Sequence, residues 1–81
     1  MTEPEILDRV RLAFRDAWIP VDLALERDVY LDDIAGLDSV SRVRLILTLE
    51  SAFNVEILPK ENSQLRNIGD LVDLIAKKRG A

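Results

Sequence analysis

The chain has no cysteine and no histidine among its 81 residues. It therefore has no disulfide, no thiolate nucleophile and no imidazole base, and it lacks the side chains that form most zinc and haem sites. Carboxylates remain as ligands for hard cations, but none has the spacing of a calcium-binding loop. We expect no metal-binding residue and no catalytic residue in the chain.

Long hydrophobic runs are also missing, so no segment is expected to span a membrane. The start, Met1 to Glu5, is acidic and polar, whereas a secretory signal needs a basic start and then an apolar stretch. We therefore expect a cytoplasmic protein. The length allows one domain, 1–81, with a modest core, because a chain of this size buries only roughly 60% of its surface. An enzyme that encloses its own substrate is not expected.

Charge is unevenly distributed along the chain. The net charge is −4. Residues 1–38 carry ten acids against four arginines, and residues 39–81 carry five acids against seven bases. An acidic first half argues against nucleic acid as a partner, because phosphate binding needs a basic face. The basic run Lys77-Lys78-Arg79 is typical of cations at the end of a helix.

Apolar spacing predicts a first helix over about residues 3–18. Thr2 and Glu5 have the spacing of a capping box, and Pro4 is tolerated in a first turn. Pro20 is expected to end the helix, since the residue before a proline avoids helical geometry. One apolar stripe follows from three- and four-residue spacing: Ile6, Leu7, Val10, Ala13, Phe14 and Ala17.

Residues 19–37 are predicted to form a long loop, with at most a helical turn in it. Val21, Leu23 and Leu25 alternate as in a strand, but the chain has no second strand to pair with them. Long loops in small domains tend to be functional. The apolar residues expected to pin this loop to the core are Leu31, Ile34 and Leu37.

The second helix is expected from Asp38, a preferred N-cap residue, to about residue 53. Val55 and Ile57 then indicate an extended connector before Pro59. The core residues predicted for this helix are Val43, Ile46, Leu49 and Phe53.

Two further helices are predicted. A short helix or turn is expected around 61–66, and a last helix is expected after Asn67, with Gly80 as its stop. The last helix turns Leu71, Leu74 and Ile75 inward. The fold class is therefore all-α, a bundle of three main helices and one short helix, with a long loop between helices one and two.

Ser39 is the candidate functional residue, because it follows the N-cap and begins the second helix. Four backbone N–H groups lack partners at a helix start, and together with the helix dipole they favour an anion there. Asp38 places a carboxylate beside the hydroxyl. The simpler alternative is that Ser39 is only a helix-terminal residue.

The chain resembles the acyl carrier protein family from Gly36-Leu37-Asp38-Ser39-Val40 through Val43, Ile46-Leu47, Leu49-Glu50, Phe53 and Val55-Glu56-Ile57. The first helix, the acidic loop and the Ile68-Gly69-Asp70-Leu71-Val72 ending also fit. The resemblance implies an acyl-carrier-protein-like bundle with 4′-phosphopantetheine, derived from coenzyme A, on Ser39, and with Asp38 as its neighbour. The thiol of that arm would hold an acyl or aminoacyl group as a thioester, and the chain itself would not be an enzyme.

The resemblance also implies partners: a phosphopantetheinyl transferase, an acyl- or aminoacyl-loading enzyme, and a downstream acyltransferase or synthase. We expect a monomer that docks these enzymes transiently. The residues expected at the docking surface are Val40, Arg42, Arg44 and Leu47. For Val40 and Leu47, ordinary core positions are an equal alternative. For Arg42 and Arg44, the alternative is a solvated helix face.

The second helix departs from the family pattern. Fatty-acid carriers of this family usually have an acidic second helix, whereas this one carries Ser41, Arg42 and Arg44. Because charge complementarity governs partner choice, the departure favours a specialised carrier in a lipid, secondary-metabolite or aminoacyl-transfer pathway.

Two other functions are alternatives to the carrier role. A non-covalent helical adaptor would share the bundle but not the modification. A small hydrolase using Ser39 is rejected, because the chain has no histidine and its lysines have no suitable spacing. Trp18 and Tyr30 are expected to pack at the loop edge rather than contact a cofactor.

Overall fold

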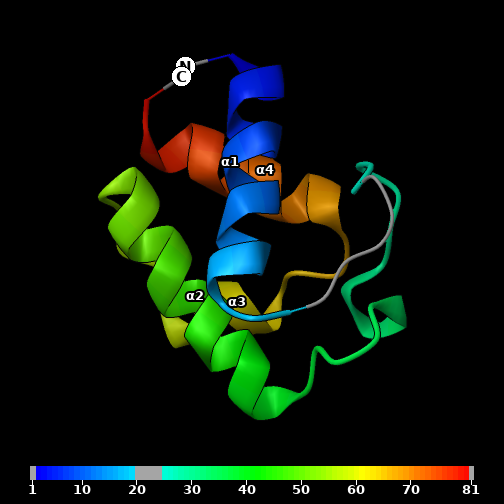
Figure 1. The fold of residues 1–81 in the computed structure, drawn as a ribbon. Coiled ribbons are helices and arrows are strands. Elements are labelled where there is room, and N and C mark those ends of the chain that lie inside the picture. Colours follow the sequence, from blue (N-terminus) through cyan, green and yellow to red (C-terminus); the bar gives the residue numbers. More distant parts are fainter. Residues whose placement is uncertain (1, 20–24, 81) are drawn as a thin grey trace.

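The computed structural model describes residues 2–19 and 25–80. In order along the chain, its elements are helices α1 (Glu3–Asp16), the 3₁₀ turn η1 (Leu31–Asp33), α2 (Ser39–Phe53), α3 (Pro59–Ser63) and α4 (Ile68–Lys78) (Figure 1). Within those residues, β pairing is limited to one isolated bridge between Tyr30 and Asn67. The predicted all-α bundle of three main helices and one short one is confirmed. In the same residues no helix is long and apolar enough to cross a membrane.

The helix boundaries differ from the predicted ones at two places. α1 ends at Asp16 rather than at about residue 18, because its chain direction already changes at Trp18. Pro20, the predicted stop, and the alternating Val21 and Leu23 lie outside the described residues.

The prediction of a short helix at 61–66 is wrong in its position, since α3 covers Pro59–Ser63. Proline suits the first position of a helix, and the Glu61 carboxylate accepts a hydrogen bond from the Leu58 N–H at 2.9 Å. The segment after α3 is tied to η1, because the Leu31 N–H donates to the Arg66 carbonyl at 2.9 Å.

One aliphatic core lies between α1, α2 and α4, and α1 contacts both of the others. α1 contributes the predicted stripe, with its capping box of Thr2 and Glu5 in place at the helix start. Among residues 2–19 and 25–80, the buried apolar side chains are those of Ile6, Val10, Ala13, Phe14, Ala17, Ile19, Leu25, Leu31, Leu45, Ile46, Leu49, Phe53, Ile57, Leu65, Ile68, Leu71, Val72 and Ile75.

The core face of α2 differs from the prediction in one residue. Val43, expected in the core, is 57% exposed, and Leu45 is buried instead. At 3.6 residues per turn, Val43 lies roughly 105° around the helix from the centre of the arc that Leu45, Ile46, Leu49 and Phe53 share. Three-residue spacing from Ile46 was therefore not sufficient to place Val43 inside.

The long loop is fastened to the start of α4. Two N–H groups that a helix start leaves without partners are satisfied by the loop: Ile68 donates to the Val29 carbonyl at 3.0 Å and Gly69 to the Arg27 carbonyl at 2.9 Å. This close approach favours glycine, because a Cβ at position 69 would lie 3.1 Å from the Arg27 oxygen, a tight contact. The predicted pins hold as well: Leu31 is buried, and Ile34 and Leu37 pack against the core.

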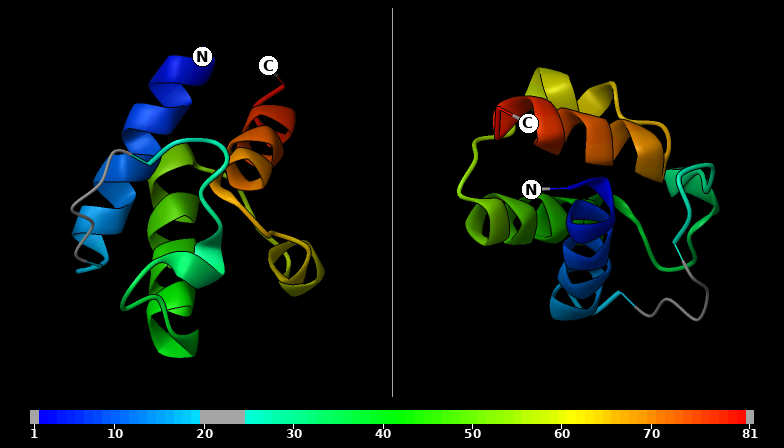
Figure 2. Two further views of the ribbon diagram at one scale, coloured as in Figure 1. Left: turned by 90° about the vertical axis from the view of Figure 1, so that its right-hand side faces the viewer. Right: turned by 90° about the horizontal axis from the view of Figure 1, so that it is seen from above.

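The loop determines where α2 begins. The start of α1 and the end of α4 lie at one end of the molecule, and the loop crosses to the opposite end, where α2 starts (Figure 2). Arg27 ties this path down by pairing with Glu3 of α1 and, at 2.9 Å, with Asp73 of α4. The first residues of α2 therefore project from an end of the bundle that the other helix termini leave accessible.

Candidate functional site

A tight turn delivers the chain to the start of α2. The Leu37 N–H donates to the Ile34 carbonyl at 3.2 Å, and Gly36 has a φ of 83°. A positive φ at the third position of a turn is the conformation that glycine adopts without strain. Because Ile34 and Leu37 both pack against the core, the turn is anchored on each side of Gly36. The residues after it have a defined position.

Asp38 is the N-cap of α2, as predicted. Its Oδ1 accepts a hydrogen bond from the Ser41 N–H at 2.8 Å, and its carbonyl accepts the Arg42 N–H at 2.8 Å. The hydrogen bond from the Ser41 amide lowers the pKa of Asp38 from its usual 3.8. The carboxylate is therefore ionised at neutral pH, and it is directed at the helix backbone.

The lowered pKa of Asp38 predicts how the stability of the fold changes at acid pH. Because folding favours ionised Asp38, its stabilisation is present above pH 3.8 and is lost as the pH falls through the lower folded-state pKa. Asp38→Asn keeps an oxygen for the cap but has no charge. At pH 7 we expect the urea midpoint of wild type to be higher than that of Asp38→Asn. The difference between the two midpoints is expected to narrow below pH 3.8. A difference in urea midpoint that stays constant down to pH 2 would contradict a stabilising role for the ionised Asp38 carboxylate.

Ser39 is the first residue of α2, and its side chain is exposed. Three other serines follow Ser39 in the chain, and each differs from it. Ser41 is half-buried, Ser51 lies near the middle of α2, and the Ser63 hydroxyl donates to the Lys60 carbonyl at 2.8 Å. Only Ser39 among these has its hydroxyl at the start of a long helix. An anionic ester at this oxygen would be stabilised by the helix dipole and the terminal N–H groups.

An exposed apolar stripe runs along α2 from this point. Val40, Val43 and Leu47, here called the α2 stripe, are 68%, 57% and 61% exposed. Their spacing of three and four residues places them on one helix face. Of the two alternatives weighed for Val40 and Leu47, the structure excludes the core. Their predicted docking role stays a prediction.

Arg42 lies on the opposite side of α2, where it holds α3. Its guanidinium donates to Oδ1 of Asn62 at 3.0 Å and to the backbone carbonyls of Asn62 and Leu65 at 2.8 and 3.0 Å. These three bonds give the side chain a structural role that sequence reasoning missed, because nothing local links position 42 to position 62. The docking role predicted for Arg42 stays a prediction.

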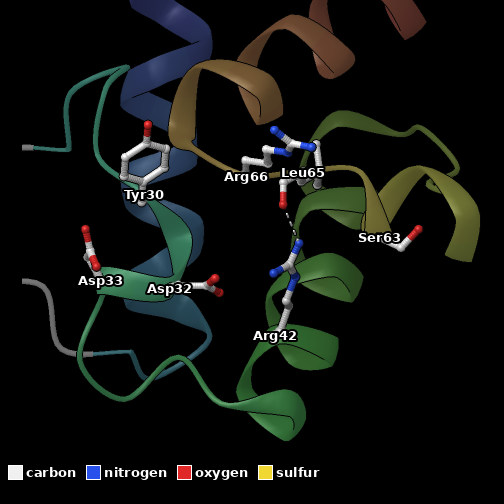
Figure 3. Close-up of a pocket in the computed structure, with 7 residues that line it drawn as sticks. All are labelled: Tyr30, Asp32, Asp33, Arg42, Ser63, Leu65 and Arg66. Carbon is white, nitrogen blue, oxygen red and sulfur yellow. Dashed lines mark hydrogen bonds between the residues drawn. The ribbon is translucent and has the colours of Figure 1, made fainter.

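Arg42 also forms one wall of a polar hollow of about 520 Å³ between η1, α2 and the segment after α3. Figure 3 shows Arg42 reaching from α2 to the Leu65 carbonyl, with Asp32 extending toward it from η1. The remaining lining residues are Tyr30, Asp33, Ser63, Leu65 and Arg66. The hollow is open and mixed in charge, and it presents no assembled set of catalytic groups.

Trp18 and Tyr30, expected to pack at the loop edge, are both exposed. Trp18 is 81% exposed, and the guanidinium carbon of Arg44 lies 5.4 Å from its ring centroid. Tyr30 is 55% exposed. The prediction of loop-edge packing is wrong for Trp18, because the left-handed backbone at this residue turns the side chain outward.

Comparison with known proteins agrees with this geometry. Residues 19–75 match the family model described as "Phosphopantetheine attachment site". This segment includes the long loop, all of α2 and α3, and most of α4.

The individual relatives are named as acyl carrier proteins. The chain is 32% identical over 82 residues, covering the full length of both chains, to an acyl carrier protein of Guillardia theta. It is 29% identical over 75 residues, 93% of each chain, to acyl carrier protein 2 of Ralstonia nicotianae. The solved structure of the holo acyl carrier protein from Geobacter metallireducens superposes with a TM-score of 0.82 at 33% identity, covering 93% of this chain and 86% of that one. The chain therefore belongs to the acyl carrier protein family, whose members are non-catalytic carriers of acyl groups held on phosphopantetheine.

Proposed function

We propose that Ser39 carries the phosphopantetheine group. The observation that carries this proposal is the exposed hydroxyl at the first position of α2, inside the segment that matches the attachment-site family. Ser41, Ser51 and Ser63 lie in the same segment but are half-buried, mid-helix or hydrogen-bonded to a local carbonyl. Ser39 is the exposed serine of this segment that begins a long helix.

The residues around Ser39 fit a phosphate ester. The start of α2 supplies unpaired N–H groups and the positive end of the helix dipole. The neighbouring carboxylate of Asp38 is directed at the Ser41 N–H, which reduces its repulsion of a second anion. The bound group supplies a thiol that holds an acyl or aminoacyl group as a thioester. This complements a chain without cysteine.

Attachment requires only one group from this chain. The Ser39 oxygen attacks the phosphorus of coenzyme A that bears the pantetheine; the new P–O bond replaces the anhydride P–O bond, and adenosine 3′,5′-bisphosphate leaves. The hydroxyl proton passes to a base of the transferase. The protein's own contribution is to present the hydroxyl on a rigid helix start, which lowers the entropic cost of orienting it.

We further propose a specialised pathway. Along α2 the charged residues are Arg42, Arg44 and Glu50, and the first turn has no acid. The Glu50 carboxylate accepts the Ile57 N–H at 2.8 Å, so it serves the connector after the helix. The exposed face of α2 is therefore apolar and cationic, unlike the acidic face of fatty-acid carriers, and it suits partners with a less basic docking surface.

A carrier of this kind needs partner enzymes and a compartment in which to meet them. The partners are a phosphopantetheinyl transferase, an acyl- or aminoacyl-loading enzyme and a downstream acyltransferase or synthase. The unit that acts is a single monomeric domain spanning 1–81 in the cytoplasm. Its cargo is passed between enzymes by transient docking, which the small area of a single helix face favours.

The attachment is tested by intact mass. Purified protein is incubated with coenzyme A and a broad-specificity phosphopantetheinyl transferase, and the modified peptide is then fragmented. We expect a gain of one phosphopantetheine group, located on Ser39. A gain on another serine would overturn the assignment of the site. The absence of any gain would favour the non-covalent adaptor.

The pathway is tested by malonyl transfer. The modified protein and a housekeeping fatty-acid carrier are compared as substrates of the malonyl transferase of fatty-acid synthesis. We expect a kcat/KM at least about tenfold lower for this protein, mainly through KM, because its docking helix lacks the acids that a basic enzyme surface pairs with. Equal values would contradict the specialised assignment.

A further inference from the structure

The polar hollow between η1, α2 and the segment after α3 begins one helical turn from Ser39. Ser39 and Arg42 are three residues apart on α2, so they are neighbours on one side of the helix. Arg42, which forms the α2 wall of the hollow, lies about 4.5 Å further along the helix axis. A flexible phosphopantetheine arm on Ser39 is much longer than this step. Its acyl end can therefore fold back into the hollow, where the tether makes even weak contacts effective.

The lining of the hollow is mainly polar. Leu65 is the one aliphatic residue among those that line it, and it is 8% exposed. A long apolar chain would cover little apolar surface there, and it would remove charged groups from water, which costs free energy. The volume of about 520 Å³ lies within the roughly 300–1,000 Å³ of small-molecule sites. The hollow therefore fits a small polar group better than an aliphatic one.

Arg42 has unused donors at the edge of the hollow. A guanidinium has five N–H donors, and the bonds from Arg42 to Asn62 and Leu65 come from Nε and Nη2. Within the part of the chain that the structure describes, no hydrogen bond from Nη1 accompanies these three. Figure 3 shows this second terminal nitrogen on the side that faces Asp32. Because the three bonds hold the guanidinium in place, its free N–H groups have a fixed direction.

Asp32 supplies the opposite charge across the hollow. Its carboxylate extends from η1 toward Arg42, whereas the carboxylate of the neighbouring Asp33 points away from Arg42 (Figure 3). The ion pairs found among residues 2–19 and 25–80 involve neither Asp32 nor Arg42, so a gap separates the two charges. A group that fills this gap must accept hydrogen bonds on one side and carry a positive charge on the other. An aminoacyl thioester has both features, in its carbonyl oxygen and its ammonium group.

We propose that the hollow binds the aminoacyl end of the cargo, a proposal that rests on the attachment of phosphopantetheine at Ser39. The cargo carbonyl oxygen accepts hydrogen bonds from Nη1 of Arg42, and the cargo ammonium pairs with the Asp32 carboxylate. The carrier then serves small amino-bearing acyl groups rather than fatty acyl chains. An acyl group of the same shape without the ammonium leaves Asp32 unpaired, and polar sites discriminate between ligands in this way.

The test compares three forms of the full chain, each made by transfer of an arm from coenzyme A or its analogue: an arm without cargo, a glycyl arm and a propionyl arm. Glycyl and propionyl have the same shape and differ by an ammonium in place of a methyl group. An amide replaces the thioester in both, so that neither hydrolyses. In the glycyl form we expect nuclear Overhauser contacts between the cargo methylene and the Arg42 side chain, and a shift of the Asp32 amide resonance. Both signals are expected to be absent from the other two forms.

Asp32→Asn is the variant that tests the ion pair, because it keeps the shape of the side chain and removes its charge. In the glycyl form it is expected to lose the contacts to Arg42. Asp33→Asn is the matched control: it makes the same change in net charge one residue away, and it is expected to keep the contacts. Both residues are exposed, so both variants are expected to have the urea midpoint of wild type. Arg42 is left unchanged because it also holds α3.

The other outcomes would overturn the proposal in different ways. Equal loss in the two variants would show a general effect of charge rather than a site at Asp32. The same contacts in the propionyl form, or from the arm without cargo, would assign the hollow to the arm itself. No contact in any form would overturn the aminoacyl site, while the gain in mass would still establish attachment at Ser39. No gain in mass would overturn both.

Discussion

Ser39→Ala is expected to remove all phosphopantetheine transfer while the protein stays folded. The reaction needs a nucleophilic oxygen at this position, and alanine has none, so the loss is complete rather than partial. Stability is expected to change by less than about 0.5 kcal/mol, because Ser39 is exposed and the cap of α2 is made by Asp38. Intact mass measures the modification and urea unfolding the stability.

Ser41→Ala is the matched control for this result. Ser41 is two residues along the same helix, and what caps the helix is its backbone N–H, which alanine retains. The control is expected to accept one phosphopantetheine group as wild type does. A mass gain that persists in Ser39→Ala, or a collapse of its helical signal, would show that Ser39 is not the attachment point or that its role is structural.

Phe14→Ala is expected to cause the largest loss of stability. Phe14 is 1% exposed, in the helix that contacts both α2 and α4. Removing a buried phenylalanine side chain costs about 3–5 kcal/mol through lost transfer energy and the cavity that remains. A domain of this size has a total stability of roughly 4–12 kcal/mol. The variant should therefore lose about a quarter or more of the wild-type free energy of unfolding, measured as a fall in the urea midpoint followed by circular dichroism.

Leu12→Ala separates burial from hydrophobicity on the same helix. Leu12 is 48% exposed, and alanine is a good helix former, so the free energy of unfolding should change by less than about 0.5 kcal/mol. Similar losses for Leu12 and Phe14 would mean that the face of α1 that the core covers has been assigned incorrectly.

Features that depend on near neighbours were predictable from the sequence. The capping box of Thr2 and Glu5 and the caps at Asp38 and Asn67 each join residues three apart, and all are present in the structure. The stripe of α1 was predicted for the same reason, since helical periodicity repeats within one element. The start of α2, and with it the exposed position of Ser39, follows from such local signals.

Other features depend on contacts that no local pattern reports. Val43 and Leu45 each fit a helical stripe, and only the direction of the neighbouring helices leaves Val43 exposed. Arg42 was interpreted as a surface charge, but it spans 20 residues of sequence to hold Asn62. Trp18 was expected to pack, and its outward direction came from a backbone conformation that composition does not indicate.

The sequence by itself determined the class of the fold, the helix that begins at Asp38, and the serine placed at its start. Each rests on short-range chemistry: caps, periodicity and the absence of cysteine and histidine. The tertiary structure decided which faces stay in water. The α2 stripe is a face of α2 that the core does not cover. The bond from Arg42 to α3 and the contact of Arg44 with Trp18 join residues that the packing of different elements brings together. Packing geometry is a property of the whole chain, so it cannot be obtained from any one segment.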